Sequence, residues 1–160
     1  MKVELKFIVR ASIIAAIYAA LTIILRPISY GQIQIRVAEA LTVLPFFTPA
    51  AIPGLFIGCI IANIAGGLGW MDILFGSLAT LIAAYLTYLM PKSKRILAPL
   101  PPVLINGLVV GWVVSTVYDL PLVISMIAVA GGQFISCYAL GYPLLNVFKN
   151  NEHLNRILKG

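Results

Sequence analysis

The stretch Gln32-Ile33-Gln34-Ile35-Arg36-Val37-Ala38-Glu39 is a short polar segment in an otherwise strongly apolar chain. The chain is 61% hydrophobic and has a mean hydropathy of +1.03. If the stretch is helical, Gln32, Arg36 and Glu39 stand at i, i+4 and i+7 and share one face. A charge inside a membrane costs about 2.5–3.5 kcal/mol on insertion scales, so it is usually paired or functional. The stretch therefore predicts the wall of a binding cavity.

Long uncharged runs around this stretch predict transmembrane helices. A spanning helix needs about 20 mostly apolar residues, and no charged residue occurs in 11–25, 40–71, 73–90, 96–118 or 120–148. Allowing for breaks at proline and glycine, we expect six spans, near 8–26, 36–48, 51–66, 72–90, 100–117 and 121–148. Residues 1–160 are thus expected to form one all-α membrane domain whose second and third spans are short.

The distribution of basic residues predicts the topology of these spans. The chain has 11 Lys and Arg against 5 Asp and Glu, a formal net charge of +6. Three basic clusters precede span one, separate spans four and five, and follow span six: Lys2, Lys6 and Arg10; Lys92, Lys94 and Arg95; Lys149, Arg156 and Lys159. An even number of spans puts all three on one side, which the positive-inside rule makes cytoplasmic. We therefore expect a multi-pass cell-membrane protein with both termini in the cytoplasm.

Several other classes of protein are not favoured by the sequence. Nucleic-acid binding is not indicated, because the basic residues lie at span ends rather than in a patch with interleaved aromatics. The N-terminal segment also resembles a secretory signal peptide, but Arg26-Pro27 follows it where small residues would mark a cleavage site. A retained first helix is the favoured interpretation.

The motifs of soluble and metal-dependent enzymes are absent from the sequence. It contains no G-x-x-x-x-G-K-[ST], no H-E-x-x-H, no G-x-S-x-G and no cluster of His and Cys. Cys59 and Cys137 fit neither a disulfide framework nor a metal pattern, and small apolar packing residues are the expected interpretation. We expect no catalytic residues, no metal and no cofactor. If the protein transports a solute, another subunit must supply the energy.

Polar residues that topology does not explain lie at or near the three loops opposite the basic clusters, or within spans five and six. The candidate ligand-binding residues are Gln32, Arg36, Glu39, Asn63, Trp70, Asp72, Asn106, Tyr118, Asp119 and Gln133. Polar groups that converge on one side of a small bundle predict a solute site open to the outside.

Each candidate also has a purely structural interpretation. Arg36 and Glu39 could form an i,i+3 ion pair, and Asp72 and Asp119 could be helix caps. Asn63 could end the third helix, and the amides within spans could bind neighbouring helices. The aromatic residues also fit an interfacial belt.

Small residues in the first span form two stripes with a spacing of four. One stripe is Ala11, Ala15 and Ala19, and the other is Ser12, Ala16 and Ala20. Small residues at this spacing let helix backbones approach closely in lipid. The stripes therefore predict either docking to another membrane protein or packing against the chain's own helices.

Three segments resemble the QueT family: QIRVAEALTVLPFFTPAAIPG at 34–54, GCIIANIAGG at 58–67 and DILFGSLATL at 72–81. QueT proteins are substrate-binding S-components of energy-coupling factor (ECF) transporters, associated with uptake of queuosine precursors, which are 7-deazaguanines. The resemblance implies a six-helix bundle with a pocket toward the outside, formed by the outer loops and helices four to six. It also implies three partners, one T-type membrane protein and two ATPases. The Ala-x-x-x-Ala spacing of the first helix resembles the feature by which S-components dock to the T-type protein.

A 7-deazaguanine has chemistry that the candidate residues could recognise. Its N1–H and exocyclic amine are adjacent donors that one carboxylate can accept, with Glu39 the first choice and Asp72 or Asp119 as rivals. The remaining roles are an amide donor to the 6-oxo group, an aromatic face for the ring, a second carboxylate for any ammonium, and Arg36 to orient Glu39. The candidates are Asn63, Asn106 or Gln133 for the amide, and Trp70, Tyr30 or Tyr118 for the aromatic face.

The sequence leaves two other classes of function open. The chain could be an S-component for a different heterocyclic vitamin. It could also be a carboxylate-dependent membrane enzyme or a small channel.

Overall fold

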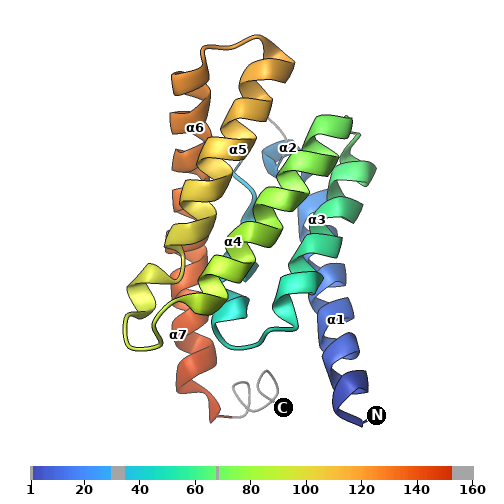
Figure 1. The fold of residues 1–160 in the computed structure, drawn as a ribbon, viewed down its shortest axis with the longest axis vertical. Coiled ribbons are helices and arrows are strands. Elements are labelled where there is room, and N and C mark those ends of the chain that lie inside the picture. The colour runs from blue at the N-terminus through green and yellow to red at the C-terminus, as the bar shows by residue number, and fades with distance from the viewer. Residues whose placement is uncertain (1, 30–34, 68, 153–160) are drawn as a thin grey trace.

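The computed structural model describes residues 2–29, 35–67 and 69–152, and every regular element in these ranges is helical. Figure 1 shows the helices as an elongated bundle. The elements are α1 (Lys2–Ile24), α2 (Arg26–Ser29), the 3₁₀ helix η1 (Val37–Phe46), α3 (Ala51–Gly66), the π-helix η2 (Asp72–Gly76), α4 (Ser77–Leu89), the short 3₁₀ helix η3 (Arg95–Leu97), α5 (Leu100–Tyr118), α6 (Leu122–Phe134), the π-helix η4 (Ile135–Gly141) and α7 (Tyr142–Asn150).

Four helical segments are long and apolar enough to cross a membrane. They are Glu4–Ile24, Asp72–Leu89, Arg95–Tyr118 and Leu122–Asn150. The two remaining apolar helices are shorter: η1 has 10 residues and α3 has 16. At about 2.0 and 1.5 Å per residue they extend roughly 20 and 24 Å, less than the roughly 30 Å of a hydrocarbon core. The all-α expectation is confirmed, and four of the six expected spans have the length of a full span.

Pro45 and Gly67 lie close to the ends of η1 and α3, in the regions where the sequence predicts breaks. Pro45 lies inside η1, and a proline removes a helical hydrogen bond. Gly67, with φ +68°, ends α3 in the left-handed conformation, and its N–H donates to the Ile64 carbonyl at 3.1 Å. Such a left-handed position favours glycine because it lacks a Cβ.

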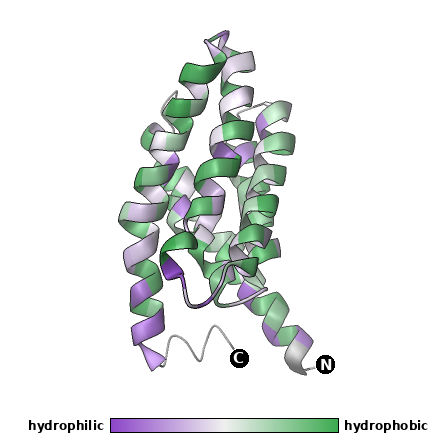
Figure 2. Cartoon of the chain, turned by 60° about the vertical axis from the view of Figure 1, so that its left-hand side comes forward, coloured by the Kyte–Doolittle hydropathy of each residue, from purple (hydrophilic) through white to green (hydrophobic). Residues whose placement is uncertain are grey.

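The basic segments lie together at one end of the bundle. Figure 1 places the start of α1, the end of α7 and the α4–α5 connection at this end, and the α5–α6 turn at the other. Figure 2 shows hydrophobic residues along much of the helical surface, where large side chains such as Ile17, Ile61 and Ile127 are exposed. This distribution suits a multi-pass membrane protein.

Helices α1 and α3 pack through small residues. An added Cβ at Gly54 would lie 2.7 Å from the Ala11 carbonyl oxygen, and one at Gly58 would lie 2.8 Å from that of Ala15. Ala11, Ala15 and Ala19 are accordingly buried within the chain. The idea that this stripe docks to a partner is therefore corrected: its side chains are covered by the protein's own bundle.

The second small stripe has the opposite environment. Ser12, Ala16 and Ala20 are exposed on the outer face of α1. Of the two stripes, this one remains accessible to another membrane protein, because α3 packs against the other.

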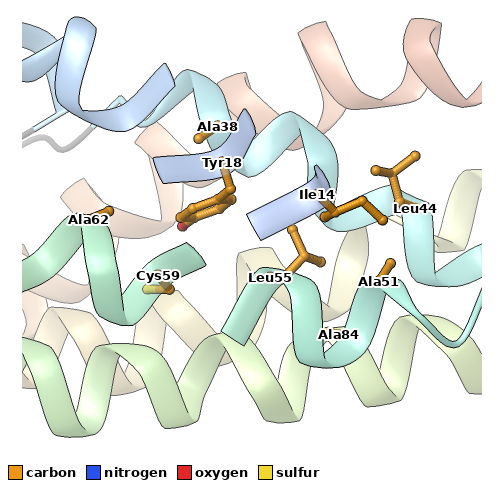
Figure 3. Close-up of a cluster of buried hydrophobic side chains, with 9 residues drawn as sticks. All are labelled: Ile14, Tyr18, Ala38, Leu44, Ala51, Leu55, Cys59, Ala62 and Ala84. Atoms are coloured by element: carbon orange, nitrogen blue, oxygen red, sulfur yellow. The ribbon is translucent and has the colours of Figure 1, made fainter. Parts of the chain in front are cut away.

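The interior of the bundle is organised around η1. This helix carries eight buried residues out of ten and lies against α1, α3, α4, η4 and α7. Figure 3 shows the cluster on its α1–α3 side, which includes Tyr18 and Cys59 as well as the aliphatic side chains of Ile14, Leu44 and Leu55. The Tyr18 hydroxyl and the Cys59 thiol are thus polar groups within an otherwise apolar cluster.

Candidate ligand-binding site

Glu39 lies at the centre of a buried polar cluster. Its side chain, 1% exposed, projects from the first turn of η1. The Tyr18 hydroxyl on α1 donates a hydrogen bond to Oε1, and the Asn106 Nδ2 on α5 donates to Oε2 at 3.3 Å. A buried carboxylate needs such donors because burial removes its hydration. One carboxylate thereby links three helices.

Arg36 supplies the positive charge of the cluster. It precedes η1 in extended conformation, and its side chain is buried. Its guanidinium interacts electrostatically with Glu39 and with Asp72, and Nη1 lies 3.8 Å from Cys59 Sγ. The charge of Arg36 therefore acts on carboxylates from two different elements.

The two cysteines belong to this polar cluster. Cys59 Sγ on α3 receives the Asn63 amide and the Thr80 hydroxyl, each at 3.5 Å, in addition to Arg36. Cys137 Sγ on η4 lies 3.6 Å from the main-chain oxygen of Glu39. Both cysteines are buried in the core as packing residues, and their sulfur atoms also meet hydrogen-bonding groups.

Asn63 and Asp72 form the side of the cluster between α3 and α4. The Asn63 Nδ2 donates to the main-chain oxygen of Asp72 at 2.9 Å. The Asp72 side chain is 6% exposed and lies in a helical segment that begins before it, at Trp70. Asp72 therefore does not cap the helix, which was its alternative structural role. Its buried side chain lies within the protein.

Two amide oxygens in the cluster lack donors. The Oδ1 atoms of Asn63 and Asn106 are buried and accept no hydrogen bond within the part of the chain that the structure describes. Both amide orientations are fixed, because only the nitrogen can donate to the Asp72 carbonyl or the Glu39 carboxylate. Leaving a buried acceptor unmet costs about 1–3 kcal/mol. The pair indicates a place for a ligand that offers donors.

Both π-helices border the cluster. Asp72 opens η2, and Cys137 lies in η4 together with the buried Ser136. Short π-helical segments occur frequently at functional sites. Gln133, the last candidate that is buried, lies one turn before Cys137 and places Oε1 3.6 Å from its sulfur. The segment from the end of α6 into η4 thus contributes Gln133 and Cys137 to the cluster.

Three predicted site residues lie apart from the cluster. Trp70 is 68% exposed, and its ring packs on Phe75 with a centroid distance of 6.2 Å. Tyr118 and Asp119 are exposed at the end of α5, where Asp119 has a φ of 52° and ends the helix. Asp119 is thus a cap at the end of one helix rather than at the start of the next. Gln32 and Tyr30 lie outside the described residues.

Sequence reasoning missed Tyr18 and Thr80. Both carry hydroxyl groups and lie within uncharged runs of the sequence. Their spacing along the chain does not indicate which residue their hydroxyl groups bind. Their one signal is that a polar side chain inside a span must find a hydrogen bond in another helix. The resemblance placed the pocket at the outer loops and helices four to six, whereas the cluster also draws on α1, η1 and α3.

The arrangement can bind a small polar solute by donors and acceptors. Among the described residues, no group of three His, Cys, Asp or Glu side chains is placed to hold a metal ion. A buried polar cluster among apolar helices, four of which are long enough to span a membrane, is typical of a multi-pass membrane transporter.

Comparison with known proteins identifies the family. The family model described as "QueT transporter" matches residues 8–150, so the chain belongs to the QueT transporter family. The "Queuosine precursor transporter QueT" of Lactococcus lactis subsp. cremoris is 43% identical over 77 residues. That match covers 47% of this chain and 45% of the relative's own length. No solved structure matches the chain significantly. The resemblance seen in the sequence is confirmed, and the family is one of transporters rather than enzymes.

Proposed function

We propose that the protein is the membrane-embedded substrate-binding subunit, or S-component, of an ATP-driven ECF importer of queuosine precursors. The substrate follows from the name of the Lactococcus relative, a queuosine precursor transporter. Those precursors are 7-deazaguanines, whose ring carries several hydrogen-bond donors on one edge. The observation that carries the proposal is the buried cluster with two amide oxygens that lack donors.

The proposed site comprises the buried candidates, namely Arg36, Glu39, Asn63, Asp72, Asn106 and Gln133. Glu39 binds the N1–H and the exocyclic amine of the ring. Its oxygens already accept from Tyr18 and Asn106, but an ionised carboxylate has about four acceptor positions and can accept more. The charge of Arg36 favours the ionised form of Glu39 and orients its carboxylate.

Partners must supply the energy for uptake. The chain has no G-x-x-x-x-G-K-[ST] motif of its own. We assign that role to two ATPases joined to the chain through a T-type membrane protein. The exposed stripe with Ala16 and Ala20 on α1 is the docking face, because its small side chains permit close backbone approach. The basic end of the bundle then faces the cytoplasm, as the positive-inside rule requires.

Binding by the purified full-length chain tests the proposal. Isothermal titration should show saturable binding of 7-deazaguanines and none of riboflavin, thiamine or biotin. Asn106→Leu should weaken 7-deazaguanine binding by about tenfold or more, the cost of one lost buried hydrogen bond or more. Thr116→Val, on the exposed face of the same helix, is the matched control and should bind as the wild type does. Binding of a vitamin in place of the deazaguanines would refute the assigned substrate.

A further inference from the structure

The two buried carboxylates of the cluster differ in how they are satisfied. Glu39 accepts hydrogen bonds from Tyr18 and Asn106. The Asp72 carboxylate accepts none from the described residues, although its side chain is only 6% exposed. Its stabilising neighbour is the charge of Arg36, which Glu39 shares. Asp72 is therefore the carboxylate with acceptor capacity to spare.

A second open acceptor lies beside Asp72. The Asn63 amide nitrogen donates to the Asp72 main-chain oxygen at 2.9 Å, which places the amide oxygen of the same group near the main chain of Asp72. That oxygen is buried and has no donor among the described residues. Two carboxylate oxygens and one amide oxygen can together receive three donors. A primary ammonium group has three N–H donors.

The charges of the cluster do not balance. In their ionised forms, Arg36 carries one positive charge, whereas Glu39 and Asp72 carry one negative charge each, so the three groups together carry one net negative charge. Residues 30–34 include no charged residue in the sequence. The nearest basic residue along the chain is Arg26, which is exposed and donates to the Gly66 carbonyl at 3.2 Å. A buried net charge is unfavourable unless it is paired. The cluster therefore favours a ligand that brings one positive charge.

Building on the proposed function, we infer that the ligand is a 7-deazaguanine whose 7-substituent carries a protonated amine, and that Asp72 and the Asn63 amide oxygen bind this ammonium group. The ring edge lies at Glu39 and Asn106. A neutral 7-substituent leaves Asp72 unpaired, so the site selects the cationic precursor over a neutral one.

A ligand series on the unaltered protein tests this inference without any risk of misfolding. The probes are 7-aminomethyl-7-deazaguanine, its N-acetylated neutral derivative and 7-cyano-7-deazaguanine. The aminomethyl base should bind at least about tenfold more tightly than either neutral base, because a charge-assisted hydrogen bond is lost with the ammonium. Equal affinity for charged and neutral bases refutes the inference and leaves the proposed function standing. Failure of all three to bind refutes both.

Two carboxylate variants then test whether Asp72 is responsible for the preference for the charged base. In Asp72→Asn, the ratio between aminomethyl and cyano affinities should fall from about ten to about one, since the amide keeps the shape and removes the charge. Asp119→Asn is the matched control, because Asp119 is exposed with a φ of 52° that asparagine adopts readily. Its ratio should stay at the wild-type value. A variant at Asp72 that loses affinity for both bases equally has a structural role only, and that result overturns the inference.

Discussion

Gly58→Ala should separate α1 from α3 and disturb the ligand site at the same time. A Cβ at residue 58 would lie 2.8 Å from the Ala15 carbonyl oxygen, 3.0 Å from the Tyr18 Cβ and 3.1 Å from the Ala15 Cα. Two of these three atoms are backbone, so no rotation of a side chain relieves the clash. The helices must move apart, and Tyr18 moves with α1 away from its hydrogen bond to Glu39.

Two opposing effects determine how much Gly58→Ala lowers the free energy of unfolding. Overpacking of a tight contact costs typically about 1–3 kcal/mol, and the upper half of that range applies here because the contact is with backbone. Alanine returns up to about 1 kcal/mol through its greater helix propensity. The net loss in the free energy of unfolding is therefore about 1–2 kcal/mol. No hydrophobic driving force between helices offsets this loss in lipid, because close packing is itself a main source of helix association there.

Unfolding of the purified protein in detergent measures this effect, and Gly131→Ala is the matched control. An added Cβ at Gly131 would meet nothing within 4 Å, although the residue lies inside α6. Gly131→Ala should therefore be as stable as the wild type or slightly more stable, while Gly58→Ala unfolds earlier and binds 7-deazaguanines several-fold more weakly. If Gly58→Ala proves as stable as Gly131→Ala, the close approach of α1 and α3 is not what holds these helices together.

Three further outcomes are expected. Tyr18→Phe removes a donor from a buried carboxylate and should cost about 1–3 kcal/mol of stability together with ligand affinity; unchanged unfolding would contradict the hydrogen bond. Cysteines introduced at the exposed Tyr118 and Ser93 should differ in intact cells, with an impermeant reagent labelling only the first; equal labelling would contradict the topology. Leu at both Ala16 and Ala20 should abolish uptake by the complex and spare ligand binding by the isolated chain; persistent uptake would place docking elsewhere.

Much of the helical order is encoded locally in the sequence. Uncharged runs, and the prolines and glycines that interrupt them, predict where helices begin and end, because hydrogen bonding within a helix depends on neighbouring residues only. Gly67 ends α3 as its position after Gly66 suggests. The second and third segments were expected to be short, and η1 and α3 are too short to span on their own.

The membership of the polar cluster was only partly accessible from the sequence. Residues with an obvious cost in a membrane, such as Glu39 and Asn106, were identified because an unpaired polar group in hydrocarbon demands an explanation. Exposed polar and aromatic residues near the same loops carry the same local signal. Trp70 and Asp119 were therefore included with them, although they lie outside the cluster.

The sequence by itself determined the class of protein and the segments that are helical, because hydropathy and backbone breaks are properties of neighbouring residues. Only the tertiary structure decided which face of α1 is buried, since Ala15 and Ala16 belong to equally small stripes and differ only in whether α3 lies against them. It likewise decided that Tyr18 donates to Glu39 while Asp72 receives no such donor. Those contacts join residues 21 or more positions apart, and their formation depends on how the helices pack.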